Sequence, residues 1–186
     1  RDFVADLDRF FGQLPQGWPY GVELRNRNWL RADYFECLAR HAIAHVYNSW
    51  EAMPPVGEQM ALAGSQTNPA LVAARFLLKP GRRYEEAVRA FQPYDRTKEV
   101  NPEARQAGAA LIAAGIKAQR RKTFVFVNNR LEGNALSTIE AMLELAGAAG
   151  LEPSGQNVHK HPICCGLDTS AVTANSQKTH ISARLR

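Results

Sequence analysis

Residues 123–127 read Thr123-Phe124-Val125-Phe126-Val127, and this stretch decides the fold class. Every position after Thr123 is apolar, and Asn128 and Asn129 follow directly. A short, continuous apolar run that ends in polar residues is typical of a strand buried on both faces, as in parallel sheets. We therefore predict a strand at 123–127 within an α/β protein.

Upstream of this strand, further extended runs alternate with segments of helical periodicity. The predicted strands lie at 20–25, 43–47 and 71–78. Apolar residues at helical spacing predict helices at 2–14, 31–41, shortly after 57, 84–91, 101–119 and 134–147. In the fifth of these, Asn101-Pro102-Glu103 supplies an N-cap, a first-turn proline and an early acid.

Four strands alternating with helices predict a parallel sheet, because parallel strands need crossover connections and hairpins need short turns. Two architectures fit this pattern. A (β/α)8 barrel needs about 250 residues, so the chain would be its second half, whereas a doubly wound open sheet is complete with four or five strands. The pattern alone leaves both open.

The length of 186 residues, 45% of them hydrophobic, suits one domain. The first residue is Arg1 and not Met, so we expect a fragment. Residues beyond 152 are rich in polar types and have little apolar periodicity. We predict one domain at 1–151, and a disordered or frameshifted tail at 152–186.

Charge and cysteine usage limit the classes of partner. The net charge of +5 is spread along the chain, and its one dense block, Arg120-Arg121-Lys122, lacks interleaved aromatic residues, so the block favours a solvated turn over a nucleic-acid partner. No apolar run reaches the ~20 residues that cross a bilayer, so we expect no membrane partner. Three cysteines, two of them adjacent, indicate a reducing, cytoplasmic location.

Polar side chains follow the predicted strands, and the carboxyl ends of parallel strands are where ligands bind in both architectures. The candidate ligand-binding residues are Arg25, Asn48, Arg75, Asn128 and Asn129, with Glu23 as a candidate general base. Guanidinium groups bind carboxylates and phosphates, so the set predicts a pocket for a small anionic or sugar-like ligand. The alternative is that Glu23 forms a satisfied ion pair with an arginine inside the barrel.

We predict no metal site. His41 and His45 fall on either side of a helix-to-strand break, which suits helix-end and core roles. The cluster at 159–165 has adjacent cysteines without the usual zinc-ligand spacing, and Cys37 is expected to be a small buried apolar residue. There is no dinucleotide, P-loop or GxSxG motif, so any cofactor stays unknown.

Three features resemble the YecE-like family, also called domain of unknown function 72. They are the segment 10–29, which contains LP and then VELRNRNW, the segment 124–133, FVFVNNRLEG, and a strand-borne Arg75 between them. The resemblance covers roughly residues 1–150 and implies a TIM-barrel-like fold whose N-terminal strands are missing here. It also places Glu23, Arg25, Arg75, Asn128 and Asn129 at the family's presumed pocket, without an established catalytic role.

The chain departs from that family's pattern at two positions. Asn48 stands where an aspartate is usual, and Arg75 is followed by Phe-Leu-Leu-Lys in place of a His-Gly pair. Both departures weaken an acid–base hypothesis. We expect the C-terminal part of a cytoplasmic barrel whose rim binds a small-molecule ligand, as a hydrolase or a lyase. The alternative is a non-catalytic binding or scaffold protein, and nucleic-acid binding is the less favoured third hypothesis.

Overall fold

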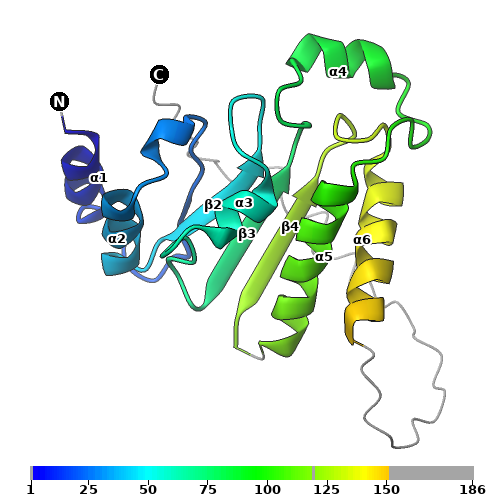
Figure 1. Cartoon of the computed structure of the whole chain (residues 1–186). Coiled ribbons are helices and arrows are strands. Elements are labelled where there is room, and N and C mark those ends of the chain that lie inside the picture. Colours follow the sequence, from blue (N-terminus) through cyan, green and yellow to red (C-terminus); the bar gives the residue numbers. More distant parts are fainter. Residues whose placement is uncertain (1, 119, 151–186) are drawn as a thin grey trace, which may run out of the picture. The chain divides into compact units, whose positions relative to one another are not determined.

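The computed structural model describes residues 2–118 and 120–150 (Figure 1). The tail predicted at 152–186, with its histidine and cysteine cluster, lies outside the described residues. The described strands are β1 (Gly21–Val22), β2 (Ala44–Ser49), β3 (Leu71–Phe76) and β4 (Lys122–Val127). The helices are α1 (Phe3–Phe11), α2 (Ala32–Arg40), α3 (Val56–Ala61), α4 (Tyr84–Phe91), α5 (Pro102–Lys117) and α6 (Ala135–Gly150), with a short 3-10 helix, η1, at Arg27–Trp29.

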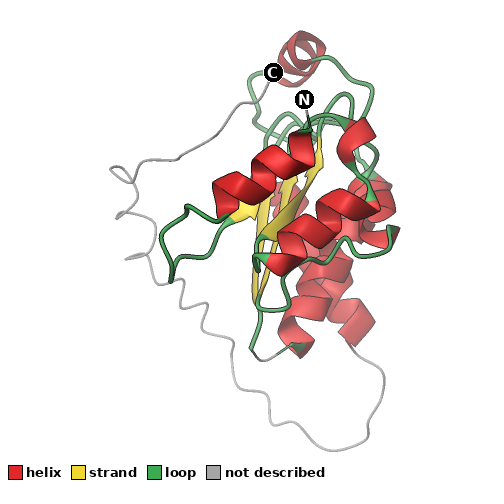
Figure 2. Cartoon of the chain, turned by 90° about the vertical axis from the view of Figure 1, so that its left-hand side faces the viewer, coloured by secondary structure: helices red, strands yellow, loops and turns green. Residues whose placement is uncertain are grey.

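The strands form one parallel sheet in the order β1-β2-β3-β4. Figure 2 shows them as one layer, with the connecting loops gathered at its two ends. A doubly wound sheet reverses its strand order at a switch point, whereas a barrel keeps the order of the sequence. The unreversed order therefore identifies a partial TIM-barrel-like domain and settles the choice that the sequence pattern left open.

One face of the sheet holds the main core. Tyr47, Val72, Ala74 and Phe76 are buried there against residues of three helices: Val56 of α3, Ala104, Ala107 and Leu111 of α5, and Met142 of α6. Helices α5 and α6 lie side by side next to β4 (Figure 1). Gly108 permits their close approach, since a Cβ at this position would lie 2.4 Å from Met142 Sδ. The covered face corresponds to the outside of a barrel.

The opposite face of β4 is open, which corrects one prediction. Phe124 and Phe126 are 46% and 55% exposed, whereas Val125 and Val127 pack against the core. Successive strand residues point to opposite faces, and among the described residues helices cover only one of them. The prediction that this strand is covered on both faces is therefore wrong for the part of the chain that the structure describes.

The predicted elements are otherwise present, with changes at their ends. The predicted N-cap is confirmed, since Asn101 Oδ1 accepts a hydrogen bond from the backbone N–H of Ala104 at 3.1 Å. Helix α6 continues to Gly150, three residues beyond the end predicted at 147. The first strand is shorter than predicted, because only Gly21 and Val22 pair with β2. None of the helices in the described ranges is long and apolar enough to span a membrane.

A buried carboxylate joins the loop after β4 to the start of α5. Glu132 is 0% exposed; it accepts two hydrogen bonds from Arg105 Nε, at 3.0 Å each, and one from Arg105 Nη2 at 2.8 Å. The backbone N–H of Asn101 and the hydroxyl of Thr138 donate to the same carboxylate at 2.6 and 2.8 Å. Gly133 follows with a φ of 112°, where a Cβ would lie 2.6 Å from the carbonyl oxygen of Arg96. This network holds the α5–α6 pair at the end of β4.

Glu132→Ala should lower the free energy of unfolding by about 3–5 kcal/mol, because it leaves the guanidinium of Arg105 without its buried partner. Urea unfolding followed by circular dichroism measures the change. Glu140→Ala, at an exposed position of the neighbouring helix α6, is the control and should stay within about 0.5 kcal/mol of wild type. A loss below about 1 kcal/mol for Glu132→Ala would contradict the assigned role.

His45 is a residue of β2 that is 2% exposed, and its side chain is surrounded by aromatic rings. Its ring meets Tyr34, Phe35 and Tyr47 edge-on at centroid distances of 5.1–5.7 Å, and its Nδ1 is hydrogen-bonded to the Tyr34 hydroxyl at 3.2 Å. Burial lowers the pKa of His45 from 6.5 to about 4. The imidazole is therefore neutral in the folded protein at neutral pH, as its predicted core role requires.

Acid should destabilise the fold through His45. Between about pH 6.5 and 4 the unfolded chain binds a proton at this histidine and the folded chain does not. The free energy of unfolding is therefore unaffected by His45 above pH 6.5 and decreases as the pH falls towards 4. The free energy of unfolding lost over this pH range amounts to about 3 kcal/mol. Urea unfolding at a series of pH values should give a steeper loss for wild type than for His45→Gln, which cannot titrate. Equal slopes would contradict this prediction.

Candidate functional site

Glu23, Arg25 and Arg75 meet at the carboxyl end of the sheet. Arg75 is the penultimate residue of β3 and lies on the face opposite to its buried neighbours Ala74 and Phe76. Its Nη1 donates to Glu23 Oε2, and Arg25 Nε donates to Glu23 Oε1 at 3.1 Å. One carboxylate thus bridges two guanidinium groups, and we call these three residues the rim cluster.

The rim cluster carries a net positive charge and is open to solvent. The side chains of Arg25 and Arg75 are 43% and 42% exposed, and that of Glu23 is 15% exposed. Among the described residues, the other N–H groups of both guanidiniums have no hydrogen-bond partner. The guanidinium carbon of Arg25 also lies 4.0 Å from the ring centroid of Trp50, which fixes its plane. The site therefore presents oriented donors to an acceptor from outside.

Asn48 supports the rim cluster from below. It is 0% exposed, and its Nδ2 donates to the carbonyl oxygen of Leu24, between the two rim residues of that segment, at 2.7 Å. Gln59 holds the backbone of Asn48 on both sides, accepting from its N–H at 3.3 Å and donating to its carbonyl at 2.6 Å. Asn48 Oδ1 has no partner in the described part of the chain. Asn48 therefore positions the segment that carries Glu23 and Arg25.

Asn128 and Asn129 shape the loop between β4 and α6. Asn128 Oδ1 accepts from the backbone N–H of Arg130 at 3.0 Å, and Asn129 Oδ1 accepts from that of Ala135 at 2.8 Å. No hydrogen bond in the described ranges joins either side chain to the rim cluster. Of the six residues predicted from strand ends, the structure brings Glu23, Arg25 and Arg75 together and places Asn48 beneath them. Asn128 and Asn129 instead accept hydrogen bonds from the backbone of the loop after β4.

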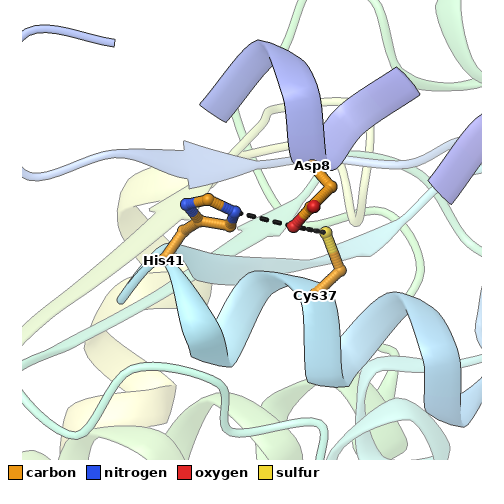
Figure 3. Close-up of side chains that lie close together, drawn as sticks. All are labelled: Asp8, Cys37 and His41. Carbon is orange, nitrogen blue, oxygen red and sulfur yellow. Dashed lines mark hydrogen bonds and ion pairs between the residues drawn. The ribbon is translucent and has the colours of Figure 1, made fainter. Parts of the chain in front are cut away.

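A second polar cluster, absent from the predicted site, lies between α1 and α2 (Figure 3). Asp8 Oδ1 accepts from His41 Nε2 at 2.8 Å and from Arg40 Nη2 at 3.1 Å, and Cys37 Sγ lies 3.8 Å from the same oxygen. Hydrogen bonds from His41 and then Arg40 lower the pKa of the Asp8 carboxyl. Burial raises the pKa of the Cys37 thiol, and the negative charge of Asp8 adds to this.

This cluster was not predicted from the sequence, where His41 was weighed as a metal ligand only together with His45. The helical spacing of Cys37 and His41, four residues apart, was the available signal. Asp8 is 33 residues away from His41 in sequence, and no local pattern connects the two. The predicted helix-end role of His41 is confirmed, since it follows directly after α2.

Comparison with known proteins gives a consistent result. A family model described as "Protein of unknown function DUF72" matches residues 1–161. A DUF72 family protein from Enterococcus faecalis V583 is 20% identical, with a TM-score of 0.50 over 85% of this chain and 56% of that chain. One from Thermotoga maritima MSB8 is also 20% identical, with a TM-score of 0.50 over 79% of this chain and 51% of that chain. At this identity the likeness concerns the fold, and the chain spans about half the length of these solved relatives. No curated protein matches the chain.

Arg75→Gln should change the free energy of unfolding by less than about 1 kcal/mol, because a half-exposed ion pair contributes little and Arg25 still neutralises Glu23. Urea unfolding of the variant and wild type checks this. A loss of several kcal/mol would assign the rim cluster to the stability of the fold and would contradict its description as a solvent-open site.

Proposed function

We propose that this chain, which belongs to the DUF72 family, binds a small anionic ligand at the rim of its strand ends through Arg25 and Arg75. Family membership supports the barrel architecture, in which the carboxyl ends of the strands are the usual place for ligands. The observation that carries the proposal is that two guanidinium groups bind one carboxylate, and that each keeps further N–H donors that bind no other described residue.

The arrangement of charge favours an anion. Two guanidiniums and one carboxylate leave one positive charge, and the carboxylate already holds both arginines in place before a ligand arrives. A guanidinium donates two parallel hydrogen bonds to a carboxylate or a phosphate, which gives both affinity and orientation. Preorganised donors lose less conformational entropy on binding than free side chains do. Phosphorylated sugars and sugar acids combine the predicted sugar-like character with the required charge.

The proposal is one of binding and includes no reaction. Each oxygen of Glu23 accepts a hydrogen bond from an arginine, so its contacts support a positioning role over that of general base. Asn48, which stands where the family usually has an aspartate, is neutral and donates its amide to Leu24. The hydrolase or lyase activity considered from the sequence has no candidate base or acid in these contacts.

A non-catalytic scaffold role is the second candidate. The observation that favours it is the open face of β4, where Phe124 and Phe126 present large apolar side chains to solvent. In that case partner contacts would involve these phenylalanines, and Arg75→Gln would leave partner binding unchanged.

Thermal unfolding in the presence of inorganic phosphate, sugar phosphates and sugar acids tests the first proposal. A ligand at about 100 times its Kd adds about 2.7 kcal/mol, which for a domain of this size raises Tm by roughly 5–10 °C. Arg75→Gln and Arg25→Gln should abolish that shift. Arg9→Gln, which removes an exposed arginine from an ion pair on α1, is the matched control and should keep it. Absence of any shift in wild type, or its persistence in both rim variants, would refute anion binding here.

A further inference from the structure

Three potential metal ligands converge between α1 and α2, in the cluster of Asp8, Cys37 and His41 (Figure 3). Each offers one ligand atom, and the three atoms all lie within 4.8 Å of one another. Cys37 and His41 come from one helical turn of α2 and its end, and Asp8 comes from α1. Two helices packed against each other thus bring a sulfur, a nitrogen and an oxygen to one point.

The spacing of these atoms is close to that of a bound zinc ion. Tetrahedral Zn²⁺ has bonds of about 2.0–2.3 Å, which puts its ligand atoms about 3.3–3.8 Å apart. Cys37 Sγ and Asp8 Oδ1 are already 3.8 Å apart. His41 Nε2 and Asp8 Oδ1 are 2.8 Å apart, as a hydrogen bond requires, so they would separate slightly to admit the ion.

The chemistry of the three ligands selects the metal. Thiolate and imidazole bind Zn²⁺ strongly, whereas Mg²⁺ and Ca²⁺ take oxygen ligands. We propose that Asp8, Cys37 and His41 form a Zn²⁺ site with three protein ligands and a fourth position open to solvent. The side chains of Asp8 and His41 are 47% and 26% exposed, which provides the route of entry to the buried sulfur.

Binding changes the protons and hydrogen bonds of the cluster. The Cys37 thiol gives its proton to solvent and binds as thiolate, and His41 binds through the unprotonated Nε2 in place of its hydrogen bond to Asp8. Arg40 also donates to Asp8 Oδ1, and its positive charge opposes the cation. The Arg40 side chain is 58% exposed, so it can turn into solvent when the ion enters.

Co²⁺ is the probe for this site, because a thiolate bound to Co²⁺ absorbs in the near ultraviolet. Residues 159–165 contain two histidines and two cysteines that could bind the same ion. The full chain is therefore used with His159→Ala, His161→Ala, Cys164→Ser and Cys165→Ser as the background. In it, Co²⁺ should bind at one equivalent with a thiolate absorption band, and Zn²⁺ should displace it. Cys37→Ser should abolish the band.

Asp8→Asn and His41→Ala should each weaken Co²⁺ binding by more than the roughly 10- to 100-fold that loss of an outer partner costs. Arg40→Gln should tighten it by roughly severalfold, because it removes a repelling charge, whereas a cluster that serves only as a hydrogen-bond network would show no such gain. Should Cys37→Ser fail to fold by circular dichroism, Asp8→Asn and Arg40→Gln decide the matter. No Co²⁺ binding in the background protein, or binding unaffected by Asp8→Asn, would overturn the proposal.

Discussion

The buried carboxylate of Glu132 is the interaction on which the architecture around β4 depends. An ionised group can stay at 0% exposure only when its oxygens are paired, and here Arg105, the N-terminus of α5 and Thr138 of α6 supply the donors. The carbonyl oxygen of Glu132 also accepts from the backbone of Lys98 at 2.8 Å, which anchors the chain leading into α5. The two helices that cover the outer face of β4 are thereby fixed to the loop after it.

Much of this fold could be predicted from the sequence, because alternating apolar runs and helical periods are local patterns. The strands predicted at 71–78 and 123–127 and the helix predicted at 84–91 are present as β3 at Leu71–Phe76, β4 at Lys122–Val127 and α4 at Tyr84–Phe91. The exposure of Phe124 and Phe126 could not be predicted, because an apolar strand has the same sequence pattern whether helices cover both of its faces or only one. The ion pair of Glu132 with Arg105 could not be predicted either, because the two residues are 27 positions apart and Glu132 lies in a loop, where a charged residue is usually exposed.

The candidate site was partly predictable for the same reason. Parallel strands carry their ends to one rim, so the sequence alone groups Glu23, Arg25 and Arg75. Asn128 and Asn129 also follow a strand end, but their side-chain oxygens accept hydrogen bonds from backbone N–H groups of their own loop, as is common for asparagines in turns. Strand-end position therefore predicts where a side chain lies but not which neighbour takes its hydrogen bonds.

Among the described carboxylates that pair with basic groups, Glu132, Glu23 and Asp8 differ in exposure, and these differences separate structural ion pairs from candidate binding sites. Glu132 is fully buried and all its partners are internal, so no ligand reaches the pair. Glu23 is mostly buried, but its two arginines reach solvent with donors left over, which suits an incoming anion. Asp8 is half exposed and one of its oxygens meets a histidine, an arginine and a cysteine at once, so a cation could replace the weaker of these contacts. The same ion-pair chemistry thus stabilises the fold at Glu132 and underlies the anion binding proposed at Glu23 and the metal binding proposed at Asp8, according to which groups remain open to solvent.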